Sequence, residues 1–255
     1  MKYTLPSTKH SELLENLIVK HGQIVTTKDI FAEAQAFLTH KQAEYSITTL
    51  TKQGWLVRVR NGLYVISDLS TRGFLVLSPY KVANLLVNDS YVSFESALQY
   101  HGMFDQLTNK VISVALKMHK TVQLQNTEYV FVKTKAYYFG WQEVTIDNQM
   151  VWIATAEKAL IDMINFHRSI YSIDVVIEKL REHKNNLDFV RMDDYISRMS
   201  MTTIKIFGFI FDLLVIDSSQ LLKRAKSVKG AHRMTADAKY FNAKWRLYYD
   251  TYFSP

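Results

Sequence analysis

Residues 39–66 read THKQAEYSITTLTKQGWLVRVRNGLYVI, and the spacing of the apolar positions changes within this stretch. Its first half carries Ala43, Ile47 and Leu50 at helical spacing, which predicts one buried helix face. In its second half apolar and polar residues alternate, and Asn61-Gly62 separates two such runs. Asn-Gly there favours a type I′ hairpin turn, which needs positive φ at both residues. The stretch predicts a helix followed by a β-hairpin.

Two shorter helices are expected upstream of this stretch. Residues 11–21 carry leucine and isoleucine on one helical face and are followed by a glycine. Thr26 and Asp29 resemble a capping box, which predicts a second helix running through Ala34. The third helix begins near Thr39. The order is then helix, helix, helix and two-stranded hairpin, which is the order of a winged helix-turn-helix.

Beyond residue 70 the patterns of helix and strand are mixed. Helices are expected over residues 79–87, 93–100 and 155–166 and within 173–226, and strands over residues 111–116, 121–125, 128–133, 143–146, 150–153 and 244–249. The expected fold class is α+β. An N-terminal winged helix-turn-helix domain, residues 1–70, is followed by a larger mixed α+β domain, residues 71–255.

The composition is that of a globular protein outside the membrane. Of 255 residues, 48% are hydrophobic and 22% charged, and no cysteine is present. The absence of cysteine excludes disulfides and thiolate chemistry and fits a reducing compartment. The polar start has no apolar signal core, and the most apolar run, residues 204–216, is too short to span a bilayer. We therefore expect a cytoplasmic protein and a buried helix at 204–216.

Motifs of catalysis and cofactor binding are missing from the sequence. It contains no GxGxxG or phosphate-binding loop, no HExxH and no GxSxG. Asp193 and Asp194 are adjacent and would point differently on a helix, and His167 stands alone after an apolar run. We expect a protein without enzymatic activity, and infer no cofactor, metal or small-molecule ligand.

The predicted third helix has a polar side opposite its core face. Amide and hydroxyl groups suit base edges and lysines suit phosphates. We expect DNA contacts from Lys41, Gln42, Tyr45, Ser46, Thr48, Thr49 and Lys52, with Ser46 nearest the core edge. In the hairpin, Arg58 and Arg60 share one face, and arginine suits phosphate well. A net charge of +7 also favours a polyanionic partner.

A second interpretation of the same residues stays open. Any exposed helix is polar on its outer face, and a charged hairpin edge discourages aggregation. The N-terminal domain would then be a scaffold for protein contacts that binds no DNA.

Three stretches resemble the AbiEi-like antitoxin family, the transcriptional-regulator half of bacterial AbiE-type toxin–antitoxin operons. They are residues 50–64 (LTKQGWLVRVRNGLY), 91–102 (YVSFESALQYHG) and 153–162 (IATAEKALID). The resemblance implies an antitoxin-like second domain and an autoregulatory repressor that binds repeats in its own promoter. It also implies that the second domain neutralises a nucleotidyltransferase-like toxin. Direct contact with that toxin is left open.

The two motifs in the second domain allow structural and partner-binding roles. Serines and acids can cap helices or occupy their first turns, and a histidine suits a helix C-terminus. A surface for a partner would be formed by Ser93, Glu95, His101, Glu157 and Lys158.

A basic segment lies near the C-terminal end of the sequence. Between residues 223 and 233 it carries several cations and no acid. They are Lys223, Arg224, Lys226, Lys229 and Arg233. A solvated loop is the ordinary interpretation. The alternative is a second polyanion site, for flanking DNA or for an RNA.

Overall fold

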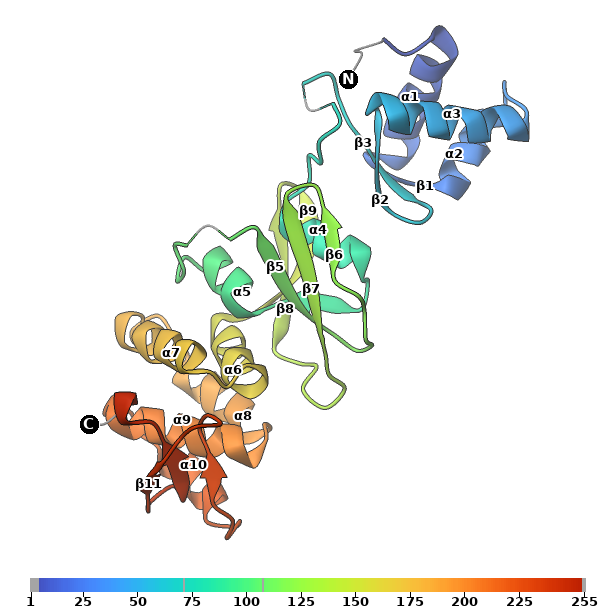
Figure 1. Ribbon diagram of the computed structural model, residues 1–255. Coiled ribbons are helices and arrows are strands. Elements are labelled where there is room, and N and C mark those ends of the chain that lie inside the picture. The colour runs from blue at the N-terminus through green and yellow to red at the C-terminus, as the bar shows by residue number, and fades with distance from the viewer. Residues whose placement is uncertain (1–4, 71, 107, 254–255) are drawn as a thin grey trace.

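The computed structural model describes residues 5–70, 72–106 and 108–253, and its fold is α+β, as expected (Figure 1). The molecule is elongated. A unit of helices with a small sheet stands at one end, a six-stranded sheet lies in the middle, and helices with a second small sheet form the other end. Residue 71, where the second expected domain begins, lies outside the described residues. No described helix is long and apolar enough to cross a membrane.

The N-terminal unit contains three helices and three strands. In chain order they are α1 (Thr8–His21), β1 (Ile24–Thr26), α2 (Thr27–Ala34), α3 (His40–Gln53), β2 (Leu56–Arg60) and β3 (Leu63–Ile66). The three strands form an antiparallel sheet in the order β1-β3-β2. The expected helices and hairpin are present. Strand β1 was not expected, because three residues are too few to show an alternating pattern.

Local signals in the sequence set the helix ends of this unit. The Thr26 hydroxyl accepts from the backbone N–H of Asp29, and the Asp29 carboxylate accepts from the backbone N–H of Thr26 at 2.7 Å. The expected capping box is therefore confirmed. Helix α3 ends at Gly54, whose φ of 81° lies in the left-handed region that glycine enters at low cost.

The turn of the hairpin differs from the expected type I′. Gly62 has a φ of 73°, whereas Asn61 is not among the described residues with positive φ. The pairing of β2 with β3 shifts register between Arg58 and Arg60. A single left-handed glycine together with a bulge is a second way to match the twist of two strands. The type I′ prediction was wrong for this reason.

The hairpin belongs to two hydrophobic cores at once. Leu56, Tyr64 and Ile66 pack in the core of the N-terminal unit. Val59, Leu63 and Val65 pack in the larger core, which contains most of the other buried apolar residues. Strand β3 is thus buried along its whole length. Helix α4 (Pro79–Leu86) lies beside β2 and extends the larger core to the hairpin.

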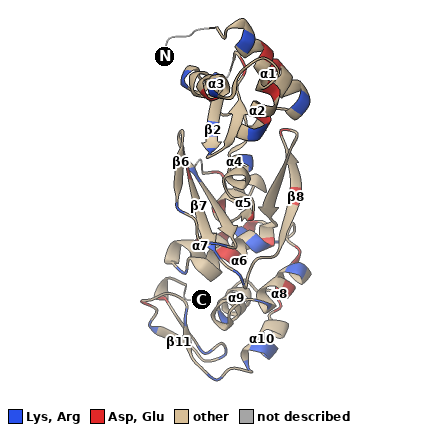
Figure 2. Ribbon diagram, turned by 90° about the vertical axis from the view of Figure 1, so that its right-hand side faces the viewer, with Lys and Arg blue, Asp and Glu red and all other residues tan. Residues whose placement is uncertain are grey.

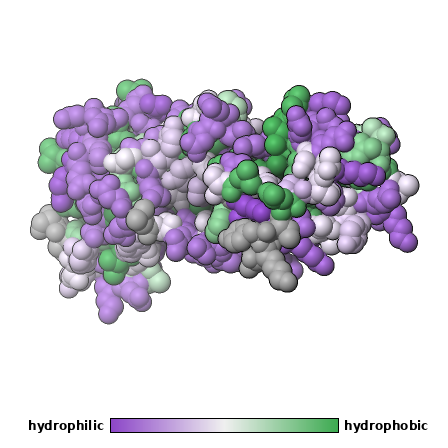
Figure 3. All heavy atoms as spheres, turned by 90° about the horizontal axis from the view of Figure 1, so that it is seen from above, coloured by the Kyte–Doolittle hydropathy of each residue, from purple (hydrophilic) through white to green (hydrophobic). Residues whose placement is uncertain are grey.

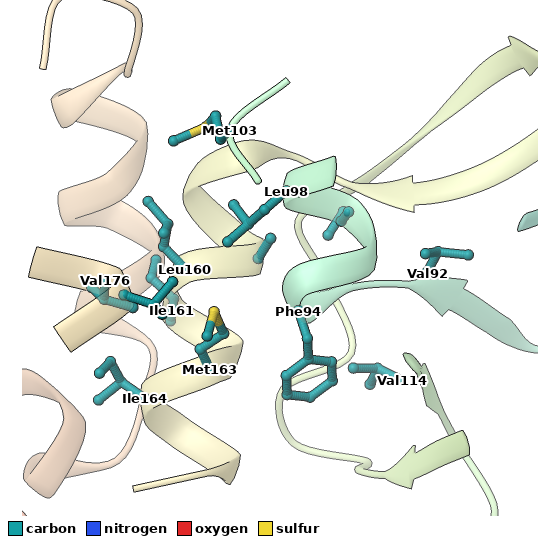
Figure 4. Packing of buried hydrophobic residues seen from close by; sticks show 14 of the residues in the cluster. Val92, Phe94, Leu98, Met103, Val114, Leu160, Ile161, Met163, Ile164 and Val176 are labelled. Atoms are coloured by element: carbon teal, nitrogen blue, oxygen red, sulfur yellow. The ribbon is translucent and has the colours of Figure 1, made fainter. Parts of the chain in front are cut away.

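A six-stranded mixed sheet forms the middle of the molecule, in the order β6-β7-β5-β4-β9-β8. Its strands are β4 (Ser90–Val92), β5 (Lys110–Ala115), β6 (Val122–Leu124), β7 (Thr127–Lys133), β8 (Trp141–Ile146) and β9 (Gln149–Ala154). Helices α5 (Phe94–Tyr100) and α6 (Ala156–Phe166) pack together beside it, and Figure 4 shows Phe94 and Leu98 facing the side chains of α6. All but β4 matched an expected element.

Four α-helices, a small sheet and a 3-10 helix (η1, Thr251–Phe253) complete the described part of the chain. They are α7 (Ile170–Glu182), α8 (Phe189–Ser197), α9 (Met201–Leu213) and α10 (Ser219–Ala225), followed by β10 (His232–Arg233), β11 (Tyr240–Asn242) and β12 (Leu247–Tyr249). Helix α9 is buried as expected from its apolar run. Gly208 on α9 faces the indole of Trp245, and a Cβ there would lie 2.1 Å from the nearest ring atom. The sheet is therefore packed directly on the helix.

Candidate nucleic-acid interface

Helix α3 presents an open polar ridge. Its first turn is fixed by a capping box, in which the side-chain oxygen Oε1 of Gln42 accepts from the backbone N–H of Thr39 at 2.9 Å. Lys41, Tyr45, Thr48 and Lys52 are exposed, and Tyr45 reaches 71%. Thr49 is half-buried. The second unit does not cover this ridge, and Figure 2 shows basic residues on α3 (blue).

One hydroxyl group and one side-chain amide on α3 already make hydrogen bonds within the protein. The Thr48 hydroxyl donates to the Glu44 carbonyl at 3.1 Å, so only its lone pairs remain for a ligand. The Gln42 side chain keeps its amide N–H groups, because the capping box uses its oxygen. Both residues can still contact a base edge, but each offers fewer groups than its type suggests.

Ser46 is a correction to the expected set. Its side chain is 3% exposed, and its hydroxyl bonds the Nε2 atom of His10 at 3.1 Å. It lies on the core face of α3 with Ala43, Ile47 and Leu50. A buried hydroxyl that already has a partner in α1 cannot reach a base. The bond instead ties α3 to α1.

The two hairpin arginines are not equivalent. Arg58 is exposed, and its Nη2 atom donates to the Asn61 side chain at 2.8 Å, so the guanidinium lies across the turn. Arg60 is also exposed, but its Nη2 atom donates to the side chain of Asn88 at 3.3 Å. Asn88 follows α4, so this bond links the hairpin to the second unit. Each guanidinium thus uses one N–H group for an asparagine and keeps the others for a phosphate.

The two motifs of the second unit meet in a buried polar network. The Lys158 ammonium bonds the Asp162 carboxylate and donates to the Tyr91 hydroxyl at 2.9 Å. The Ser93 hydroxyl donates to Asp162 at 2.7 Å, and the Tyr91 hydroxyl donates to it at 3.2 Å. Lys158, Asp162 and Ser93 are completely buried. The network joins β4 to α6.

Burial shifts the pKa values of this network. It lowers the pKa of Lys158 and raises that of Asp162, because the low dielectric of the interior disfavours both charges, while their mutual attraction opposes both shifts. Burial also raises the pKa of Tyr91 well above its usual value. Every acidic and basic group here already has a partner. The arrangement therefore holds secondary-structure elements together and leaves no free group for a ligand.

Three of the five residues expected on a partner surface are therefore corrected. Ser93 and Lys158 belong to the buried network, and Ser93 forms no side-chain cap on α5. Glu157 is 3% exposed and accepts from the backbone N–H of Asp188 at 2.9 Å. His101 donates from Nε2 to the Ala154 carbonyl at 2.8 Å. Glu95 is half-buried. These motifs encode packing between α5, α6 and the sheet.

Tyr91 and Asp162 were not expected among the important residues. Asp162 lies one helical turn after Lys158, a spacing at which opposite charges pair. That spacing was a usable signal in the sequence. Nothing comparable indicated that Tyr91, 67 residues away from Lys158, would complete the network.

The basic segment does not form one loop. Lys223 and Arg224 lie on α10, and Arg224 donates to the Ser197 carbonyl at 3.1 Å. Lys226 and Lys229 are exposed between α10 and β10. Arg233 is on β10 and lines a pocket together with Arg168. The segment is therefore spread over a helix, a loop and a strand.

The fold has a solved counterpart. The crystal structure of the Rv2827c protein from Mycobacterium tuberculosis matches this chain with a TM-score of 0.65, over 96% of this chain and 92% of that chain. The two sequences are 11% identical, so the likeness concerns the fold alone. No protein-family model matches the sequence, and no curated protein is significantly similar to it.

The candidates that remain lie on the N-terminal unit, and all of them are exposed except the half-buried Thr49. They are Lys41, Gln42, Tyr45, Thr48, Thr49, Lys52, Arg58 and Arg60. Within the described ranges, no three His, Asp or Glu side chains gather as metal ligands. What this surface offers is hydrogen-bonding groups from one helix and guanidinium groups from the adjacent hairpin.

Proposed function

We propose that the N-terminal unit is a winged helix-turn-helix that binds double-stranded DNA, and that the protein is a transcriptional regulator. The order α1-β1-α2-α3-β2-β3 supports the proposal, since α3 then takes the place of the recognition helix. The observation that carries it is the uncovered ridge of α3, with Tyr45, Lys41 and Lys52 exposed beside Arg58.

The chemistry of that surface suits a duplex. Lysine and arginine contact phosphates, and they determine affinity and its dependence on salt. Tyrosine, threonine and glutamine groups on the same helix can contact base edges in the major groove. The ridge carries one acid, Glu44, whose exposed carboxylate lies within 3.7 Å of His40. The surface is thus polar and cationic with little opposing charge.

We further propose that the protein is an antitoxin and an autoregulatory repressor of its operon. This part rests on the resemblance of residues 91–102 and 153–162 to the AbiEi-like family. The partner would be a nucleotidyltransferase-like toxin. The buried state of Ser93, Glu157 and Lys158 argues that, if the toxin is bound directly, other residues make the contact.

A mobility-shift experiment tests DNA binding. The full chain is titrated into duplex DNA from upstream of its own gene at low salt, with an unrelated duplex of equal length as the control. A shift of the upstream duplex that persists against excess competitor is expected. Absence of any shift at low salt would contradict the proposal.

Co-expression tests the antitoxin role. The full chain is expressed together with the product of the adjacent reading frame, which the proposal expects to be a nucleotidyltransferase-like toxin, and growth is measured. Rescue of growth is expected. The variant Tyr45→Ala should still rescue growth, because Tyr45 lies on the DNA-binding surface and outside the second unit. A neighbouring gene of this class that the chain fails to neutralise would contradict the antitoxin proposal.

The rival function is a protein-interaction module, and one surface of the N-terminal unit favours it. A pocket of about 440 Å³ lies against α1, with Leu5, Ile18, Val19 and Leu69 around it. Val19 and Leu5 are each 78% exposed and Leu69 is 73% exposed. Figure 3 shows apolar side chains gathered on this end of the molecule. Failure of the chain to shift DNA at low salt would favour this rival function over DNA binding.

A further inference from the structure

A second cationic site is built into the C-terminal end of the molecule. A pocket of about 350 Å³ is lined by Arg168, which follows α6, and by Arg233 of β10. Phe166 and residues 234–236 complete the walls. The two arginines are 65 positions apart in the sequence, and the fold brings them to one cavity. The volume falls in the range of small-molecule sites, which begins at roughly 300 Å³.

The charges of these arginines are not neutralised. Arg168 is exposed, and its side chain forms no hydrogen bond or ion pair within the described part of the chain. Arg233 is held by the Ala238 carbonyl and by the ring of Tyr248, whose centroid is 4.7 Å from the guanidinium carbon. A carbonyl and a ring fix the guanidinium without cancelling its charge. Arg233 is therefore oriented and still available to an anion.

Two more basic residues, His232 and Lys205, lie close enough for charge interactions with each other, and His232 also with Arg168. Lys205 on α9 is completely buried, and its ammonium donates to the Gly230 carbonyl at 2.5 Å with no carboxylate in an ion pair among the described residues. Burial lowers the pKa of His232, and the nearby charges of Lys205 and Arg168 lower it further. Burial also lowers the pKa of Lys205, with a further contribution from Arg246. The charges of Arg168, Lys205 and Arg246 thus reach this part of the fold from three separate segments.

One carboxylate touches the wall of the pocket. Asp250 accepts from the Thr235 hydroxyl at 2.7 Å, so this acid is held by the wall itself. It forms no ion pair with either pocket arginine in the described structure. Positive charge therefore predominates around the cavity. An anion would relieve the repulsion between its cations.

We propose that this pocket binds the phosphoryl group of a nucleotide. Two guanidinium groups are suited to phosphate, because each offers several N–H donors in a fixed plane. The cavity has room beyond a single phosphate, and Phe166 supplies an aromatic wall for the base or the sugar. The site lies at the end of the molecule opposite α3 (Figure 1), so the proposal is independent of DNA binding by the N-terminal unit.

Calorimetric titration of the full chain tests the site. The probes are inorganic phosphate, AMP, ATP and adenosine. AMP and ATP are expected to bind, phosphate to bind more weakly, and adenosine not to bind detectably. Binding of adenosine as tightly as AMP would overturn the proposal, because the phosphoryl group would then not be recognised. Absence of binding by every probe would also overturn it.

Matched variants locate the site. Arg168→Gln should weaken AMP binding about tenfold or more, since a charge-assisted contact is lost, while the fold is kept because this side chain has no structural partner. Lys226→Gln, an exposed cation between α10 and β10, is the control and should leave AMP binding unchanged. Equal losses in both variants would overturn the proposal in favour of general surface charge.

The same variants separate this site from the DNA surface. Arg168→Gln should leave the mobility shift of the upstream duplex unchanged. A parallel loss of AMP and DNA affinity would overturn the assignment, because Arg168 would then serve the DNA backbone. Failure of the full chain to bind DNA at all leaves the nucleotide titrations interpretable.

Discussion

Lys158 and Asp162 lie one turn apart on α6, are both completely buried, and bond each other and the Tyr91 hydroxyl. Removing one charge leaves the other buried without its partner. We expect Lys158→Met or Asp162→Leu alone to lower the free energy of unfolding by about 3–5 kcal/mol. Urea denaturation followed by circular dichroism measures this.

The double variant distinguishes the ion pair from simple packing. Lys158→Met combined with Asp162→Leu should cost clearly less than the two single losses added together, because no uncompensated charge remains. Asp194→Ala breaks the exposed pair with Arg198 on α8 and should have a far smaller effect. Additive losses in the double variant would show that the pair is not coupled.

Gly208 makes a second stability prediction. A methyl group at this position would overlap the indole of Trp245, so Gly208→Ala should lower the free energy of unfolding by about 1–3 kcal/mol. Gly230→Ala is the control, since its Cβ would meet only the His232 ring at 3.9 Å. Thermal unfolding of the two variants measures the difference. Equal melting temperatures would mean that the C-terminal sheet does not pack on α9 as described.

The capping box of α2 predicts a pH dependence. Hydrogen bonds from Thr26 lower the pKa of Asp29 below its usual value. The stabilisation from this carboxylate is therefore complete above its unfolded pKa of about 4 and is lost as the pH falls through the lower folded pKa. Wild type should lose more stability than Asp29→Asn between pH 7 and pH 2.5. Parallel curves of unfolding free energy against pH would contradict this role.

The proposed DNA-binding surface makes predictions for two residues. Arg58→Ala should weaken binding to all duplexes alike and flatten the dependence of log affinity on log salt by about one unit, as expected for one phosphate contact. Tyr45→Ala should reduce the preference for the upstream duplex over the unrelated one. Lys117→Ala, an exposed cation in the second unit, should change neither quantity. An unchanged salt slope in Arg58→Ala would exclude the hairpin from the interface.

The long elements of the fold could be predicted from the sequence, and several of the shortest could not. Helix α3 was expected from its apolar spacing and ends at Gly54 as predicted. Strands β1, β4 and β10 have three residues or fewer, and their place depends on pairing with strands far along the chain. Pairing across such distances leaves no local pattern.

The candidate sites also differ in how far the sequence could predict them. The ridge of α3 followed from helical geometry, because exposure on a single helix is a local property. The burial of Ser93 with Asp162 depends on contact across 69 positions, and the pocket of Arg168 and Arg233 depends on contact across 65. The run of cations between residues 223 and 233 suggested one continuous patch. In the fold one of them, Arg233, instead lines a pocket together with Arg168, which precedes α7.

The hairpin of β2 and β3 has consequences for any attempt to divide the chain. A fragment ending at residue 70 would expose Val59, Leu63 and Val65 to water, since their packing partners lie beyond the cut. An excised N-terminal unit is therefore expected to aggregate unless it carries α4 as well. If the N-terminal unit is fused to another protein, its boundary should be placed after residue 92. That boundary lies within the second domain as expected from the sequence.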